Sequence, residues 1–140
     1  MLLLIHLIVS LILVAILFPL FGFYSLIVLI GGFFIDLDHI IFHGVKFKSF
    51  DLMKAYNYCR EITVNKKIKE YKKVIKVFHS VEFVFLIAVF SFYYKIFLIL
   101  LMGMIIHIIM DLINEYPIFG NLNPYSIIIY VKNVKKYKKE

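Results

Sequence analysis

Acidic and imidazole side chains gather in the segment IDLDHIIFH, residues 35–43, at the end of a run that is otherwise apolar. Two more pairs of this kind follow: His79 with Glu82 three residues later, and His107 with Asp111 four residues later. On a helix, residues three or four apart lie on the same face. Imidazole nitrogens and carboxylate oxygens are ligands for zinc, manganese and iron. The spacing therefore indicates either a divalent metal site or a network of His–Asp hydrogen bonds.

Within the first cluster, Asp36, His39 and His43 fall on one side of a regular helix, whereas Asp38 points roughly opposite Asp36. Gly31–Gly32 just before the cluster, or a helix end at Leu37, would re-aim Asp38. His43 borders a polar loop, so we expect it to be solvated rather than to be a ligand.

The energetic case for a metal comes from the membrane. A carboxylate at the centre of a membrane helix costs about 2.5–3.5 kcal/mol and is usually paired or functional. The cations nearest in sequence are Lys76 and Lys95. A divalent ion neutralises several carboxylates and imidazoles together, which mutual His–Asp pairing does less completely. Zinc is the first choice, with manganese or iron as alternatives.

The composition places the chain among integral membrane proteins. Apolar residues make up 63% of the 140 residues, against roughly 45–50% in soluble domains. The net charge of +7 is concentrated in a basic loop, 44–76, and a basic tail, 131–140. Such blocks favour contact with the bilayer and its anionic headgroups. No nucleic-acid partner is expected, and the single cysteine, Cys59, is expected to be an ordinary reduced thiol.

The apolar runs predict a single all-α domain, residues 1–140, built as a four-helix membrane bundle. A spanning helix needs about 20 apolar residues, and Pro19 and Gly22 mark a hairpin within the first long run. We predict a surface helix within 51–76, a loop at 114–124, and a short strand or helix at 125–131. The predicted membrane helices are 2–18, 23–42, 77–94 and 96–113.

Orientation follows from the basic segments, because cytoplasmic loops carry the excess of Lys and Arg. We therefore expect a multi-pass protein of the cell membrane with both termini and the 44–76 loop in the cytoplasm. This topology brings the ionisable residues of all four helices to the cytoplasmic half of the membrane. The chain has five histidines, and all of them fall in this layer.

The motifs DLDH at 36–39, HS at 79–80 and HIIMD at 107–111, followed by FG at 119–120, resemble those of a known family. It is the membrane-bound, metal-dependent hydrolase family also described as LexA-binding, inner membrane-associated hydrolases. Ile35 stands where that family usually has proline, and KVIKVF at 73–78 replaces an expected His-Arg-Gly segment. The resemblance implies a metal held by His6, Asp36, Asp38, His39, His79, His107 and Asp111.

The sequence leaves three functions open. The first is a metal-dependent hydrolase that cleaves an ester or phosphodiester, such as that of a lipid, at the cytoplasmic face. Glu82 or a spare aspartate would accept the proton there. The second is a non-catalytic multi-pass protein with a structural metal or His–Asp network. An ion or metal conductor is the third, and the bare outer halves of all four predicted helices argue against it.

Overall fold

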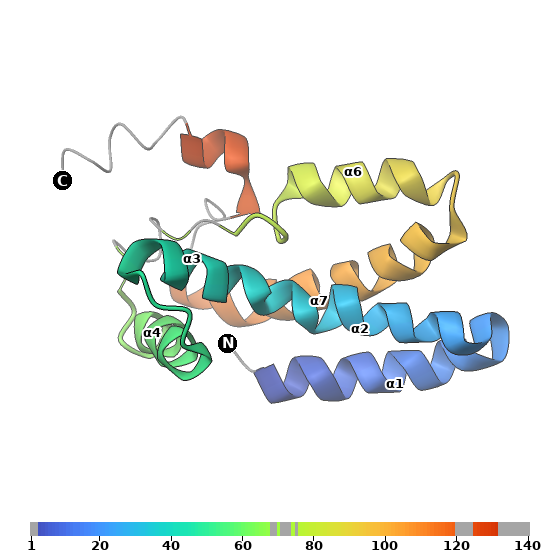
Figure 1. The fold of residues 1–140 in the computed structure, drawn as a ribbon, viewed down its shortest axis with the longest axis horizontal. Helices are drawn as coiled ribbons and strands as arrows, with labels where there is room; N and C mark the ends of the chain where they lie inside the picture. The colour runs from blue at the N-terminus through green and yellow to red at the C-terminus, as the bar shows by residue number, and fades with distance from the viewer. Residues whose placement is uncertain (1–2, 68–69, 71–73, 75, 120–124, 132–140) are drawn as a thin grey trace.

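The computed structural model describes residues 3–67, 70, 74, 76–119 and 125–131, and over these residues the protein is all-helical (Figure 1). The elements are α1 (Leu3–Phe21), the 3₁₀ segment η1 (Gly22–Ile27), α2 (Val28–Gly32), the 3₁₀ turn η2 (Phe34–Asp36), α3 (Leu37–Phe47), α4 (Leu52–Val64), α6 (Val81–Ser91) and α7 (Lys95–Phe119). A short helix over 127–131 follows.

The first long apolar run folds back on itself. α1 is followed by η1, and α2 then returns alongside α1 (Figure 1). The reversal begins at Gly22, whose φ of +56° lies in the left-handed region that glycine adopts without strain. α7 packs against α2 and α6, so that the longest helix runs through the middle of the molecule.

A glycine seam, Gly31, Gly32 and Gly103, brings α2 and α7 into close contact. A Cβ atom on Gly31 would overlap the carbonyl oxygen of Leu100, and one on Gly103 would overlap that of Val28. Small residues allow helix backbones to approach closely, as in many membrane helix pairs. The seam therefore sets how near the polar residues on the two helices come to each other.

The distribution of polarity is inverted relative to a water-soluble fold. On α1, His6 and Ser10 are buried, whereas Leu4 and Leu20 are 68% and 73% exposed. Two segments, Leu3–Phe47 and Lys95–Ile118, are long and apolar enough to cross a membrane. An apolar outer surface over buried polar groups is the arrangement that membrane helices adopt.

The structure corrects several predicted helix ends. α1 continues past Pro19 to Phe21, so the predicted end at residue 18 is too early. The predicted helix 23–42 is broken by η1 and η2 and extends to Phe47. Of the predicted helix 77–94, only Val81–Ser91 is helical, about 16 Å at 1.5 Å per residue. That length is short of the roughly 30 Å hydrocarbon core.

The predicted loop at 114–124 is wrong for its first half, because α7 runs to Phe119 with Pro117 inside it. Residues 120–124 lie outside the described part of the chain. The short 127–131 segment is a helix, one of the two predicted alternatives.

α4 confirms that the segment 51–76 contains a helix, and the position of that helix on the membrane surface stays a prediction. The helix starts after Asp51, whose side chain accepts hydrogen bonds from the backbone N–H groups of Met53 and Lys54. These bonds, chiefly the one from Lys54, lower the pKa of Asp51. Residues 68–69, 71–73 and 75 of the basic loop, and 132–140 of the basic tail, lie outside the described residues.

Candidate metal centre

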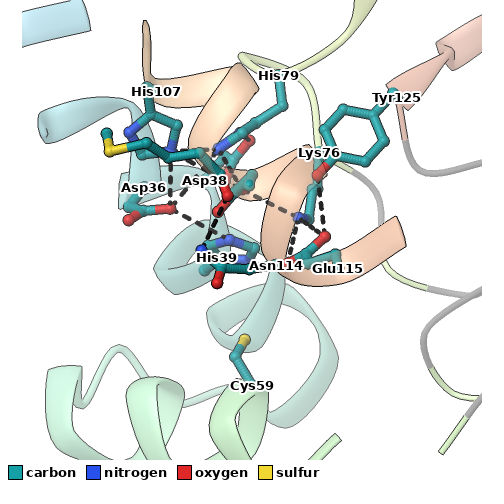
Figure 2. A network of polar contacts seen from close by, with 12 residues as sticks. Asp36, Asp38, His39, Cys59, Lys76, His79, His107, Asn114, Glu115 and Tyr125 are labelled. Carbon is teal, nitrogen blue, oxygen red and sulfur yellow. Dashed lines mark hydrogen bonds and ion pairs between the residues drawn. The ribbon is translucent and has the colours of Figure 1, made fainter. Parts of the chain in front are cut away.

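Two imidazoles face each other at the centre of the site (Figure 2). His79 Nε2 lies 2.9 Å from His107 Nε2. The opposite nitrogen of each ring is held by an acceptor: His107 Nδ1 donates to the Gly32 carbonyl at 2.8 Å, and His79 Nδ1 donates to Asp38 Oδ2 at 2.9 Å. In the neutral rings the two Nε2 lone pairs therefore point at one another. Such a contact is repulsive without a cation or a shared proton between them.

Two carboxylates complete this group. Asp36 Oδ1 lies 3.6 Å from His79 Nε2 and 3.5 Å from His107 Nε2. Asp111 Oδ2 lies 3.5 Å and 3.9 Å from the same two atoms. Four ligand atoms from Asp36, His79, His107 and Asp111 thus lie within 4.8 Å of one another, all in buried side chains.

These distances fit a tetrahedral ion. With metal–ligand bonds of about 2.0–2.1 Å, the ligand atoms of a tetrahedral zinc are roughly 3.3 Å apart. The five separations given above, 2.9 to 3.9 Å, scatter around that value. The donor set of two nitrogens and two oxygens suits zinc and equally suits manganese or iron.

The interruption between α2 and α3 explains how the chain aims these groups. In η2 the Asp36 N–H bonds to the Phe33 carbonyl instead of continuing the α-helical pattern. The last carbonyls of an α-helix lack intrahelical partners, so the Gly32 carbonyl can accept from His107. The same interruption brings Asp38 to the side of Asp36, and both are buried. Of the two predicted causes for re-aiming Asp38, the break follows Gly31–Gly32, where α2 ends, whereas Leu37 begins α3.

His6 joins the two metal-facing carboxylates from α1. Its Nδ1 lies 3.5 Å from Asp36 Oδ2, and its Nε2 lies 3.6 Å from Asp111 Oδ1. Neither nitrogen has a hydrogen-bond partner among the described residues, nor does either oxygen of Asp36. Buried polar atoms are normally satisfied. These orphaned atoms are therefore further support for a cation at this point.

His39 and Asp38 form the outer part of the cluster. His39 Nε2 lies 3.3 Å from Asp36 Oδ1, and Asp38, His39 and His79 make up a second group that can hold a metal ion. Asp38 also accepts a hydrogen bond from the Phe78 backbone N–H at 3.3 Å. All seven predicted ligands thus converge. A carboxylate that holds the far nitrogen of a ligand histidine is typical of metal sites.

A buried lysine adjoins the cluster and extends it. Lys76 Nζ lies 3.5 Å from Asp111 Oδ2, and 2.7 Å and 3.0 Å from the two oxygens of Glu115. Tyr125 donates its hydroxyl to Glu115 at 3.0 Å and places its ring under Lys76. Sequence reasoning missed Glu115 because it was assigned to a loop. The signal was present, since His107, Asp111 and Glu115 are spaced four residues apart on one face of α7.

Glu82, predicted as a catalytic base, makes other contacts in the structure. One oxygen accepts from the Ser126 hydroxyl at 2.7 Å and from the Ile128 N–H, and the other accepts from the Ile127 N–H at 3.1 Å. These contacts cap the 127–131 helix. The catalytic role of Glu82 stays a prediction.

His43 is buried, contrary to the expectation that it is solvated at the border of the loop. Its Nδ1 lies 2.9 Å from the Ser49 carbonyl, and its ring packs against Phe47 and Tyr58. These contacts, toward α4, account for its absence from both groups of candidate ligands.

Comparisons with protein-family models, with curated proteins and with solved structures found no match to this chain. The interpretation of the buried His/Asp cluster and of the two apolar segments therefore rests on the sequence and structure of this chain.

Proposed function

We propose that this protein is a membrane-embedded, metal-dependent hydrolase that cleaves an ester or phosphodiester at the cytoplasmic face of the cell membrane. We propose also that it belongs with the membrane-bound, metal-dependent hydrolases whose motifs its sequence resembles. The supporting observation is the pair of imidazoles whose Nε2 atoms face each other at 2.9 Å between two carboxylates.

Charge supports a metal as well. In the described part of the chain, four buried carboxylates, those of Asp36, Asp38, Asp111 and Glu115, share one buried ammonium, Lys76. Buried charges without compensation cost several kcal/mol each. A divalent cation among the first three carboxylates offsets that cost.

The proposed membrane arrangement would put this chemistry at the bilayer surface. We propose that α1, the η1–α3 rod, α6 and α7 form a four-helix bundle with both termini in the cytoplasm, in which the 11-residue α6 crosses only part of the hydrocarbon core. The basic residues of α3 and α4 support this orientation, because positively charged loops stay in the cytoplasm. The same charges attract anionic lipid headgroups to the site.

The residues of the cluster divide the work. The ion would be held by Asp36, His79, His107 and Asp111. Asp38 orients the ring of His79. His6, on α1, contacts the carboxylates of both Asp36 and Asp111. A divalent metal there supplies Lewis acidity and lowers the pKa of a bound water toward about 7. His39, which also borders an apolar cavity, is the group best placed to accept a proton.

Metal analysis of the purified protein is the test. We expect at least one bound zinc, manganese or iron per chain, and its loss in His107→Ala and Asp111→Ala. His43→Ala is the matched control, because it removes a buried histidine outside both candidate ligand groups. Chelation should abolish hydrolysis of p-nitrophenyl butyrate and bis-p-nitrophenyl phosphate, whichever is cleaved.

A folded protein that carries no metal after purification and after incubation with zinc would overturn the proposal. Bound metal without cleavage of either probe would favour a structural metal in a non-catalytic membrane protein.

A further inference from the structure

An apolar cavity of about 250 Å³ opens directly onto the metal centre. It lies between the start of α1, the segment 33–40 and the start of α4. Its walls include Phe33, Ile40, Ala55 and Tyr56, and Asp36 and His39 also line it. A cavity lined mainly by apolar side chains with a few convergent polar groups is the usual form of a small-molecule site.

The polar part of this cavity belongs to the proposed reaction centre. Asp36 Oδ1, one of the four candidate ligand atoms, lies 3.3 Å from His39 Nε2. Neither oxygen of Asp36 has a hydrogen-bond partner among the described residues. A molecule in the cavity therefore places one end beside the groups that would hold the metal and accept a proton.

The rim of the cavity faces outward through apolar side chains. Phe34 is 48% exposed and Leu37 is 45% exposed, and Leu52 on α4 is also exposed. A charged or strongly hydrated ligand would be desolvated without compensation along these walls. An alkyl chain would gain free energy there, at about 25 cal/mol per Å² of apolar surface removed from water.

The size of the cavity limits what it holds. Small-molecule pockets are typically about 300–1,000 Å³, so this cavity admits part of one alkyl chain and not two. α4, which forms one wall, carries exposed Arg60 and exposed Lys54, whose Nζ lies 3.6 Å from Asp51, and exposed Lys48 precedes α4. These charges favour an amphiphile with an anionic headgroup.

A second apolar cavity, of about 330 Å³, lies between α6 and α7. It touches the cluster through His79, both of whose ring nitrogens already have partners within the cluster. Asp36 and His39 line the first cavity and do not line the second. The first cavity is thus the better substrate site.

We propose that the substrate is an anionic amphiphile with one acyl chain. Its chain occupies the cavity between α1, residues 33–40 and α4, and its ester or phosphodiester lies beside Asp36 and His39. This inference rests on the proposed function for the identity of the reacting bond, whereas the chain-binding site can be tested without any turnover.

Photo-crosslinking in vesicles tests the site. The full chain is reconstituted in phosphatidylcholine and phosphatidylglycerol, and the probe is dodecanoyl lysophosphatidic acid with a diazirine near the end of its chain. We expect mass spectrometry to locate the label on residues 33–40 and on the first turns of α4. Ile40→Trp should reduce labelling by about tenfold, which corresponds to ~1.4 kcal/mol of binding.

Ile108→Trp is the matched control, because it changes another half-buried isoleucine and fills the second cavity instead. It should leave the labelling at 33–40 unchanged. If Ile40→Trp fails to fold, Leu52→Trp at the exposed rim makes the same test with less disturbance of packing.

Metal content separates the two proposals. Ile40→Trp with normal metal and lost labelling supports the acyl site. Labelling that survives in Ile40→Trp and in Leu52→Trp overturns the site even if metal is bound. Labelling that maps to α6 and α7 does the same. Labelling as expected in a protein without metal supports the acyl site and counts against the hydrolase.

Discussion

Lys76 provides a quantitative test of how charge is balanced beside the metal centre. Its side chain is 2% exposed, and its ammonium contacts Glu115 and Asp111, whose side chains are 5% and 3% exposed. Lys76→Met keeps the length of the side chain and removes its charge. Two buried carboxylates then lose their cation. Removing one partner of a buried ion pair typically costs about 3–5 kcal/mol.

For a chain of this size, Lys76→Met should therefore lower the melting temperature of the metal-free protein by about 10–20 °C. Bound metal should reduce the loss, because the ion supplies positive charge to Asp111 in place of Lys76. For the same reason Lys76→Met should bind zinc more tightly than the wild type. The assay is thermal unfolding in detergent micelles, followed by circular dichroism, with and without zinc.

A double variant, Lys76→Met with Glu115→Gln, should recover most of the stability. It removes the charge of Glu115 and keeps an acceptor for the Tyr125 hydroxyl. Lys67→Met is the control, because it breaks the exposed pair of Lys67 with Glu61, and exposed pairs contribute little. Equal losses with and without zinc, or no recovery in the double variant, would refute the reasoning.

Three further predictions follow from the helix contacts, the cap and the metal. Gly31→Ala should destabilise the protein by about 1–3 kcal/mol, because its methyl group would overlap the backbone of α7; unchanged thermal unfolding would contradict the close packing. Hydrogen bonds to Asp51, chiefly from the Lys54 N–H, lower the pKa of its carboxyl group. The carboxylate cap therefore stabilises α4 at pH values above the ordinary aspartate pKa. This stabilisation is lost as the pH falls through the lowered pKa. Amide hydrogen exchange in α4, corrected for the intrinsic pH dependence of the exchange rate, should therefore be slower in the wild type than in Asp51→Asn at pH 7, and this difference should vanish at low pH. Zinc at a hundredfold its Kd should stabilise the wild type by about 2.7 kcal/mol and leave His107→Ala unchanged in the same unfolding assay.

The helices were predictable from the apolar runs, but their ends were not. Pro19 and Pro117 were read as breaks, whereas both lie within the final turns of α1 and α7. Proline removes a single hydrogen bond and crowds the preceding turn. Near a helix end, packing against neighbouring helices can offset that cost. The error mattered more for α7, because a helix predicted to end at residue 113 leaves Glu115 outside the helical face that carries His107 and Asp111.

The expected convergence of the imidazoles and carboxylates is seen in the structure, while their role as metal ligands stays a prediction. His6, Asp36, His79, His107 and Asp111 meet, as their common depth in the predicted helices required. The partnership of Lys76 with Glu115 was not readable, because it joins residues 39 apart across a poorly patterned loop.

The sequence by itself determined that this chain hides its acids and imidazoles behind apolar helices, because composition and depth are local properties of each run. Tertiary structure alone decided which atoms face each other. The glycine seam sets the spacing of α2 and α7, and the interruption at residues 33–36 releases the Gly32 carbonyl to hold His107. Those contacts depend on distances between segments far apart in the chain, which no periodicity in the sequence records.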